Sequence, residues 1–307
     1  MRPLDLSIFH PYESAYRTGE RLGDYAYSLC GGPCDGLFVI DGSEMLKDLA
    51  VDCIGAEIPC KVLGGMSNIL ISDDGFGGII FLNRKGNISR TETESNVILL
   101  TVDSGVSMAS VVRYCRDNEL TGFEWAAGLP GTVGGAVYGN AGAFGTEIKD
   151  VFRSGELIDE TGKVQCVTKE DMEFKYRGSV LKNRSRSGIM LNAVFSLYKG
   201  THEEIISKEE SCKERRRNSQ PVSERSLGSV FKNPEGRSAG KLIEDAGLKG
   251  TSVGKATVST KHANFITTAA GIRSEDYLRL IRLIQKTVFD KFGVTLEPEV
   301  EFLGFEE

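Results

Sequence analysis

The sequence lacks the features that mark membrane-inserted, exported and nucleic-acid-coating proteins. No apolar run in it approaches the roughly 20 residues that a membrane-spanning helix needs. Residues 1–14 contain no apolar stretch of the secretory-signal type. Acidic residues outnumber basic ones by 43 to 37, and a net charge of −6 argues against a broad nucleic-acid surface. We therefore expect a cytoplasmic protein with no membrane insertion, no nucleic-acid partner and no obligatory protein partner.

Histidine is scarce, and the cysteines do not form the close pairs that bind metals. The three histidines are scattered, at positions 10, 202 and 262, and the seven cysteines include no C-x-x-C pair. The close ligand spacing of a structural zinc site is therefore missing, and we expect no metal. Without an export signal, reduced thiols are the expected state of the cysteines.

The common nucleotide-binding motifs are also missing. No G-x-G-x-x-G follows a predicted strand, so the Rossmann fold has no fingerprint here. Residues 236–242 and 250–256 resemble a P-loop but are one residue short between their glycines. Both also lack the serine or threonine after the lysine whose hydroxyl would hold magnesium. We predict neither fold.

Glycine, by contrast, is abundant: 36 of the 307 residues, roughly 12% against the usual value of about 7%. One glycine-rich loop, Gly64–Asn68, follows a short predicted strand, and a second stretch covers residues 122–145. Glycine permits close backbone approach and lets successive N–H groups converge on an anion. Taken separately, the first is a tight turn or a phosphate cradle, and the second is a ligand-binding surface or an Ω-loop. Together they suggest a dinucleotide lying across both.

Hydrophobic periodicity predicts the main helices and the last strand. Apolar residues recur at helical spacing over 43–55, 107–118 and 274–292. Thr201-His-Glu-Glu204 is a capping box that begins a polar helix between two domains. The predicted final strand, 294–303, places three alternate glutamates on one face.

Two polar segments outside the glycine-rich stretches contain residues suited to chemistry. Phe174–Ser179 places Arg177 beside an aromatic ring, where it either clamps a carboxylate or phosphate or is simply exposed. Leu227–Pro234 places the Ser229 hydroxyl near the Lys232 ammonium. A serine without a paired base forms no hydrolase triad, but it can donate a proton. Its alternative is an ordinary serine at the end of a strand.

Taken together and in this order, these segments resemble UDP-N-acetylenolpyruvoylglucosamine reductase, the UDP-N-acetylmuramate dehydrogenase of peptidoglycan synthesis. The resemblance runs from about residue 31 to 304. Met66 stands where the family commonly has a third glycine, and Gly139 replaces a bulkier residue. The short chain indicates the subclass without a substrate-covering tyrosine loop. The matching segments are VLGGMSNILISDDGF (62–76), GFEWAAGLPGTVGGAVYGNAGAFG (122–145), YRGS (176–179), GSVFKNP (228–234), GKLIEDAGLKG (240–250), HANFI (262–266) and LEPEV (296–300).

The resemblance implies an α+β fold class with a flavin domain followed by a substrate domain. The first part would be an FAD-binding domain of the p-cresol methylhydroxylase type, with two α+β subdomains at 1–60 and 61–200. An α/β substrate-binding domain, entered through a linker helix, would occupy 201–307.

The resemblance also implies the reaction. NADPH, as co-substrate, would reduce a non-covalently bound FAD, and the enolpyruvyl ether of UDP-N-acetylglucosamine would then be reduced to UDP-N-acetylmuramate. Hydride would pass from flavin N5 to C3 of the substrate, and Ser229 would protonate C2. Arg177 and Glu299 would stabilise the enolate, although Glu299 must then be protonated or orient another donor.

The ligand-contacting residues implied by the resemblance fall into two groups. Substrate contacts would come from Tyr176, Arg177, Lys232, Asn233, His262 and Asn264. Cofactor contacts would come from Gly64, Gly65, Met66, Ser67, Asn68, Gly128, Pro130, Gly131, Thr132, Gly134, Gly135, Asn140, Gly142 and Gly145. Two alternatives remain open: a flavin oxidase of the same fold, and a non-catalytic flavin or nucleotide-sugar-binding protein. Neither glycine-rich stretch contains a histidine, so we expect no covalent flavin tether.

Overall fold

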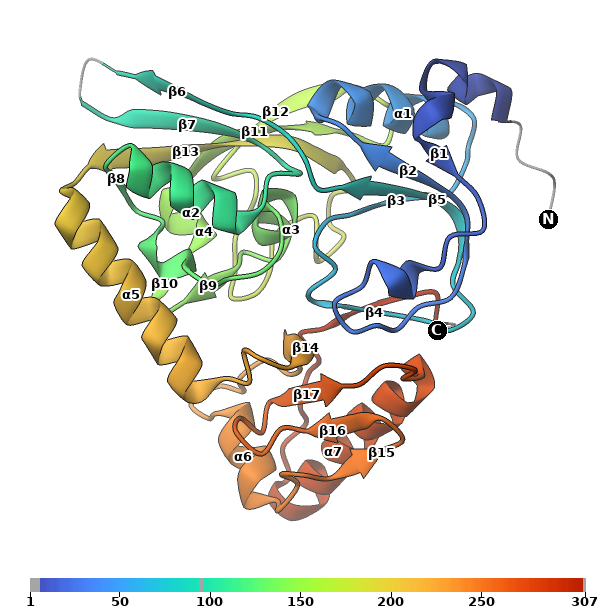
Figure 1. Ribbon diagram of the computed structural model, residues 1–307, viewed down its shortest axis with the longest axis vertical. Helices are drawn as coiled ribbons and strands as arrows, with labels where there is room; N and C mark the ends of the chain where they lie inside the picture. The colour runs from blue at the N-terminus through green and yellow to red at the C-terminus, as the bar shows by residue number, and fades with distance from the viewer. Residues whose placement is uncertain (1–5, 94–95, 306–307) are drawn as a thin grey trace. The chain divides into compact units, whose positions relative to one another are not determined.

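The computed structural model describes residues 6–93 and 96–305, which group into two compact units (Figure 1). The first contains the segments up to Thr18, Gly36–Gly65 and Gly78–Glu214. The second contains Gly19–Asp35, Met66–Gly77 and the chain from Arg215 onward. Helix and strand are mixed in both, which confirms the α+β class. The domain boundaries at residues 60 and 200 stay a prediction.

A four-stranded sheet and one long helix form part of the first unit. Helix α1 (Ser43–Gly55) matches the predicted helix and buries Leu46 and Leu49 in a core with Phe38 and Phe81. This burial of one apolar face explains why the segment is helical in the fold. The strands, in their order across the sheet, are β1 (Tyr16–Arg17), β2 (Cys34–Ile40), β5 (Phe76–Asn83) and β3 (Cys60–Leu63).

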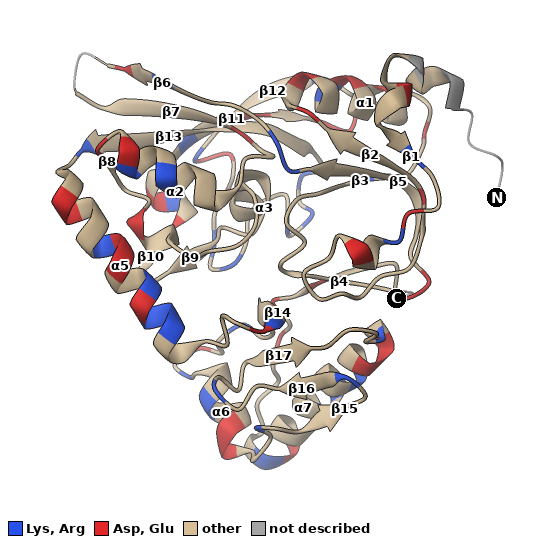
Figure 2. Ribbon diagram, in the orientation of Figure 1, with Lys and Arg blue, Asp and Glu red and all other residues tan. Residues whose placement is uncertain are grey.

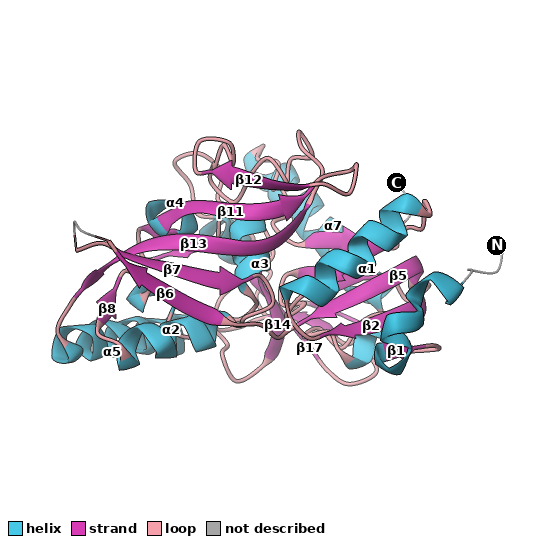
Figure 3. Ribbon diagram, turned by 90° about the horizontal axis from the view of Figure 1, so that it is seen from above, coloured by secondary structure: helices cyan, strands magenta, loops and turns pink. Residues whose placement is uncertain are grey.

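A larger antiparallel sheet completes the first unit, and Figure 3 shows its strands side by side. Helix α2 (Met108–Asp117) begins as predicted at Ser107, whose hydroxyl accepts the Ser110 N–H at 3.0 Å. The aromatic core includes Phe123 and Phe195, edge to face at 5.0 Å. Across the sheet the order is β12 (Val164–Thr168), β11 (Phe152–Ile158), β13 (Ile189–Lys199), β7 (Ile98–Asp103) and β6 (Ile88–Glu92), with β8 (Leu120–Thr121) on β13.

The second unit is built around another antiparallel sheet and two helices. Helix α7 (Ser274–Phe292) matches the predicted helix and ends at Gly293, whose φ of 65° is left-handed. Helix α6 (Ala239–Asp245) contributes to the same core. The sheet order is β14 (Arg225–Ser229), β17 (Phe265–Thr268), β16 (Ala256–Val258) and β15 (Ser252–Val253), and a separate parallel pair joins β4 (Ile69–Ile71) to β18 (Glu301–Leu303).

The predicted final strand over 294–303 is wrong in length, because only Glu301–Leu303 is a strand. Pro298 makes an isolated bridge with Phe231 and has no N–H to donate to a ladder. The Glu299 N–H donates to the Val230 carbonyl at 2.8 Å. The alternate glutamates therefore do not share one strand face.

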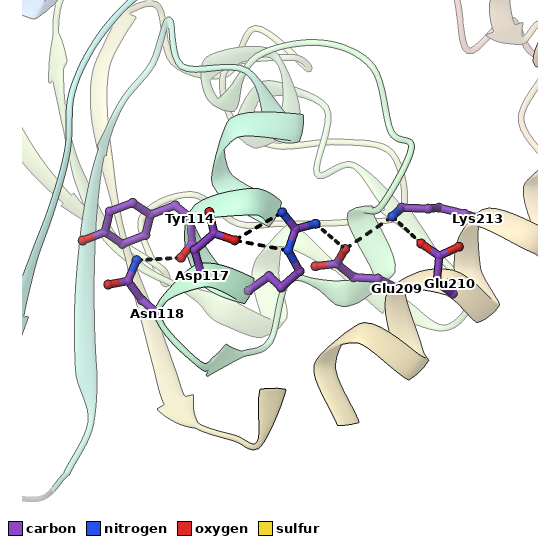
Figure 4. A network of polar contacts seen from close by, with 7 residues as sticks. Tyr114, Asp117, Asn118, Glu209, Glu210 and Lys213 are labelled. Atoms are coloured by element: carbon purple, nitrogen blue, oxygen red, sulfur yellow. Dashed lines mark hydrogen bonds and ion pairs between the residues drawn. The ribbon is translucent and has the colours of Figure 1, made fainter. Parts of the chain in front are cut away.

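Helix α5 (His202–Ser219) begins at the predicted capping box, where the Glu204 N–H donates to Thr201 Oγ1 at 3.3 Å. Acidic and basic residues alternate along it (Figure 2). On this helix the Glu209 side chain is buried and only 3% exposed. Arg116 of α2 approaches it at 3.4 Å and Lys213 at 3.5 Å (Figure 4). This network attaches α5 to α2 within the first unit.

The remaining elements are short. Among the described residues, no helix is both long and apolar enough to cross a membrane. The short elements are the 3-10 helices η1 (Leu6–Ala15), η2 (Leu22–Asp24) and η3 (Glu124–Ala126), helices α3 (Val133–Tyr138) and α4 (Ile148–Val151), and strands β9 (Gly142–Ala143) and β10 (Thr146–Glu147).

Candidate flavin and substrate site

The two glycine-rich stretches meet in the first unit. A Cβ built on Gly64 would overlap the Thr132 Oγ1, and one built on Gly65 would lie 2.8 Å from the Gly131 Cα. Side chains at either position would therefore push the two loops apart. The Arg84 Nε donates to the Gly64 carbonyl at 2.9 Å, a contact that no sequence signal indicated.

Helix α3 is packed tightly where it leaves this contact. Thr132 is its N-cap, and the Gly134 N–H donates to the Ser104 carbonyl at 2.8 Å. A Cβ on Gly134 would lie 3.0 Å from the Ser104 Cβ, so a side chain there would require Ser104 to give way by a few tenths of an ångström. Gly142 is packed more tightly, because a Cβ would lie 2.6 Å from the Glu147 Cγ and 2.8 Å from the Thr146 carbonyl oxygen. Three further glycines have a left-handed φ that favours glycine: Gly128 (80°), Gly131 (104°) and Gly145 (91°).

Gly135 differs from its neighbours, because packing within the chain does not explain it. It is exposed on helix α3, and its φ is not left-handed. Outside its own helix backbone, the nearest described heavy atom to a built Cβ is Thr132 Oγ1 at 3.9 Å. Glycine inside a helix costs about 1 kcal/mol relative to alanine. An open Cα beside the junction of the two loops fits close passage of a flat or diphosphate-bearing ligand.

Asn140 does not offer its side chain to a ligand as we expected. It is fully buried, and its amide donates to Glu147 Oε2 at 3.0 Å and to the Lys175 carbonyl at 2.9 Å. Its Oδ1 accepts the Lys149 N–H at 3.0 Å. These bonds tie the loop to its neighbours, so Asn140 fixes the conformation of the loop.

Arg177 is held against the second glycine-rich stretch. Its Nη2 donates to the Gly142 carbonyl at 3.0 Å, and its guanidinium lies 5.1 Å from the Tyr176 ring centre. The residue has a left-handed φ of 56°. For a non-glycine residue this conformation costs of order 1–3 kcal/mol, and such strain clusters at functional sites. Tyr176 is exposed beside it.

The buried carboxylate of Glu124 stabilises the start of the second glycine-rich stretch. It accepts Thr121 Oγ1 at 2.5 Å and the Gly122 N–H at 2.8 Å. Sequence reasoning missed this role. The signal was available in the Thr-Gly-x-Glu spacing, which lets one carboxylate reach back to both donors.

In the second unit, the segments that contain Ser229 and Glu299 lie side by side, although 70 residues separate the two positions in the sequence. The pairing of β14 with β17 shifts register between Ser226 and Ser229, and Gly228 has a φ of 75°. Such a bulge re-aims the residue that follows it. Beyond it, the Val230 carbonyl accepts the Glu299 N–H at 2.8 Å. Both Ser229 and Glu299 are half-buried.

The first glycine-rich loop continues into the second unit and contacts the Glu299 segment. The Asn68 amide donates to the Glu299 carbonyl at 3.1 Å, and the Glu301 N–H donates to the Asn68 carbonyl at 2.9 Å. Met66 is buried with a left-handed φ of 49°. That conformation favours glycine, the residue that the resemblance implies at this position.

Two predicted substrate residues flank the segment after Ser229. The Lys232 ammonium pairs with the Glu297 carboxylate at 2.5 Å. Asn233 Oδ1 accepts the Ala239 N–H at 3.0 Å, at the start of α6. Lys232 therefore places a cation two residues beyond the Val230–Glu299 hydrogen bond.

His262 and Asn264 both form hydrogen bonds within the protein through their polar atoms. His262 Nδ1 accepts the Asn264 N–H at 3.2 Å, and burial lowers the pKa of His262 below its ordinary value of 6.5. The Asn264 side chain is bonded to both backbone groups of Phe231 and is almost fully buried. The resemblance implied a substrate contact from Asn264, whereas its side-chain amide is bonded to Phe231 within the protein. Among the described residues, no group of three or more His, Cys, Asp or Glu side chains could hold a metal ion.

The chain is similar to known proteins in both sequence and structure. Residues 31–168 match the family model described as "FAD binding domain", and residues 220–303 match "UDP-N-acetylenolpyruvoylglucosamine reductase, C-terminal domain". UDP-N-acetylenolpyruvoylglucosamine reductase of Caldicellulosiruptor saccharolyticus is 46% identical over 80% of this chain and 77% of its own. That of Limosilactobacillus reuteri is 40% identical over 94% and 95%. The crystal structure of the Thermus caldophilus reductase is 31% identical, covers 94% of this chain and 98% of its own, and has a TM-score of 0.76.

Proposed function

Because this chain belongs to the UDP-N-acetylenolpyruvoylglucosamine reductase family, we propose that it reduces the enolpyruvyl ether of UDP-N-acetylglucosamine to UDP-N-acetylmuramate with NADPH. It is an FAD-dependent oxidoreductase with an FAD-binding domain of the p-cresol methylhydroxylase type. The product is a peptidoglycan precursor, and its soluble nucleotide-sugar substrate favours a cytoplasmic location. No protein partner is required by this proposal.

The flavin would be held where the two glycine-rich stretches meet. The backbone contact of Gly64 and Gly65 with Gly131 and Thr132 gives a side-chain-free surface, and the open Cα of Gly135 continues it. The contacts of the remaining cofactor residues expected from sequence stay predictions. When bound, FAD would supply the hydride chemistry that links NADPH to C3 of the substrate.

Arg177 would stabilise the charge that develops when hydride adds to C3. That charge spreads over the enolate formed with the substrate carboxylate, and a fixed guanidinium is a strong donor to it. The hydrogen bond from Arg177 to the Gly142 carbonyl fixes the guanidinium against the cofactor stretch. Removing one such donor typically costs 10²- to 10³-fold, or about 3–4 kcal/mol.

Ser229 would donate the proton that completes the reduction at C2. The bulge at Gly228 would re-aim Ser229, and the carbanion at C2 is basic enough to take a proton from an alcohol. The nearby Lys232 ammonium would favour the resulting alkoxide and the substrate diphosphate. Glu299 would contribute either as a protonated carboxyl or by orienting a donor, while Tyr176, Asn233 and His262 would line the substrate site.

The observation that best supports the proposal is that the Ser229 segment, just after a bulge, lies beside the Glu299 segment and is joined to it by a backbone hydrogen bond. A flavin oxidase or a simple binding protein would need no such arrangement of a proton donor. A purified protein whose yellow colour is released by heat or acid would support non-covalent FAD.

The test separates the two half-reactions under anaerobic conditions. In Ser229→Ala, reduction of the flavin by NADPH should proceed at nearly the wild-type rate, whereas reoxidation by the enolpyruvyl substrate should be blocked. Ser226→Ala, on the same strand, is the matched control and should leave both rates close to wild type. If Ser229→Ala completes both half-reactions unchanged, Ser229 is not the proton donor.

A further inference from the structure

The Asn264 side chain braces the peptide groups that follow Ser229. Its Oδ1 accepts the Phe231 N–H at 3.0 Å, and its Nδ2 donates to the Phe231 carbonyl at 2.8 Å. Its own carbonyl accepts the Val230 N–H at 2.8 Å. One residue therefore holds three backbone groups of the two residues that come directly after Ser229.

This bracing lies where the sheet itself is irregular. The β14–β17 ladder shifts register before Ser229, and Gly228 permits a wide range of backbone conformations. The segment beyond the bulge is also the one that receives Glu299, through the Val230 carbonyl. A shift of residues 230–231 would therefore displace both Ser229 and Glu299.

A direct substrate contact does not account for the geometry of this amide. The side chain is 4% exposed, and its donor and acceptor are each bonded to Phe231. Packing alone does not account for it either, since an apolar residue would fill the space without fixing peptide orientation. An amide is the group that satisfies an N–H and a C=O of the same residue at once.

We propose that Asn264 is a positioning residue that fixes the direction of the Ser229 O–H for proton transfer to C2. The inference rests on the proposed function. In that step the Ser229 O–H bond breaks, a C2–H bond forms on the substrate, and the Ser229 alkoxide regains its proton from solvent. Asn264 does not touch the reacting atoms, so its removal slows only the half-reaction that uses Ser229.

The decisive variant is Asn264→Asp, which is nearly isosteric and titratable. A neutral carboxyl can accept the Phe231 N–H and donate to the Phe231 carbonyl, whereas a carboxylate cannot donate. Burial raises the pKa of a carboxyl, so the neutral form is accessible in mildly acidic buffer. At about pH 8 we expect reoxidation to slow roughly 10- to 100-fold, the scale of a misplaced reacting group, with recovery toward the wild-type rate at about pH 5.

Other titrating groups near this position are controlled by dividing each rate by the wild-type rate at the same pH. His262 accepts the Asn264 N–H, and Lys232, Glu297 and Glu299 flank the braced segment. All four are retained in the variant. Thr267→Val, on strand β17 just after Asn264, is the matched control, because it loses a hydrogen bond to the Thr257 carbonyl away from Ser229.

The measurement is anaerobic stopped-flow absorbance of both half-reactions, with flavin content and unfolding midpoint checked for each variant. The proposal is supported if Asn264→Asp slows reoxidation while reduction by NADPH stays near normal, and if the reoxidation rate recovers at low pH. Thr267→Val should show no such slowing. Equal slowing of both half-reactions in Asn264→Asp, or a wild-type reoxidation rate in Asn264→Ser, overturns it. Failure of the substrate to reoxidise the wild-type enzyme would instead refute the proposed function. If Asn264→Asp does not fold, the same comparison is made with Asn264→Ser, without the pH arm.

Discussion

Gly135→Ala should stabilise the protein without cofactor and weaken its hold on FAD. A new Cβ has room, since Thr132 Oγ1 at 3.9 Å is the nearest described atom outside the helix backbone. Alanine is favoured over glycine by about 0.8–1.0 kcal/mol inside a helix. For a protein of this size, the gain corresponds to roughly 2–4 °C in the unfolding midpoint of the apoprotein.

The same methyl group should exclude the cofactor if FAD passes over the Gly135 Cα. Overfilling a close contact typically costs 1–3 kcal/mol, which corresponds to a roughly 5- to 150-fold weaker dissociation constant. The opposite signs make the prediction specific. A substitution that merely disturbed the fold would lower both stability and affinity.

The assay combines thermal unfolding of the apoprotein with FAD titration followed by flavin fluorescence. Gly134→Ala is the contrasting variant, since its Cβ would lie 3.0 Å from the Ser104 Cβ and should lower the apoprotein midpoint. Gly139→Ala is the control within the same region, because a Cβ there meets only the Gly135 carbonyl at 3.6 Å. Unchanged FAD affinity in a stabilised Gly135→Ala would refute the proposed path of the cofactor.

Three further predictions concern the other parts of the molecule. Arg177→Ala should lower turnover at least about 100-fold. Arg177→Gly should be equally inactive but more stable than Arg177→Ala, because glycine suits the left-handed φ of 56°. Turnover near wild type in both variants would show that Arg177 does not act in the site. Burial lowers the pKa of His262 in the folded protein below 6.5, so the unfolded chain binds more protons. Stability should therefore fall as the pH drops below 6.5. His262→Gln should flatten this part of the pH profile of the urea unfolding midpoint. Glu209→Ala should cost about 1–3 kcal/mol of unfolding free energy, whereas the exposed Glu210→Ala should cost less than about 1 kcal/mol; equal losses in a denaturant titration would contradict the structure.

Local patterns predicted those parts of the fold that are determined by local interactions. The helices at 43–55, 107–118 and 274–292 were predictable because an apolar face, an N-cap or a C-terminal glycine marks each of them. The interruption of the predicted final strand was not predictable from local patterns. The Pro298 bridge and the hydrogen bond from the Glu299 N–H to the Val230 carbonyl depend on a segment almost 70 residues away. Tertiary contacts override strand propensity in such cases.

The candidate site divides in the same way. Sequence predicted site roles for the glycine-rich loops, Arg177 and Ser229 from the motifs they belong to, and those roles stay predictions. It assigned Asn140 and Asn264 to ligands, since a polar side chain in a motif gives no sign of whether it faces inward. Burial and hydrogen bonds decide that question, and both amides are bonded within the protein. The left-handed φ of Met66 likewise became visible only in the folded backbone.

The most direct test of the central claim is anaerobic turnover of the wild-type protein reduced beforehand with NADPH. Our account predicts that the flavin absorbance stays bleached until the enolpyruvyl ether of UDP-N-acetylglucosamine is added, and then returns with stoichiometric formation of UDP-N-acetylmuramate. A reduced enzyme that ignores this substrate, or that is reoxidised rapidly by air alone, would contradict it.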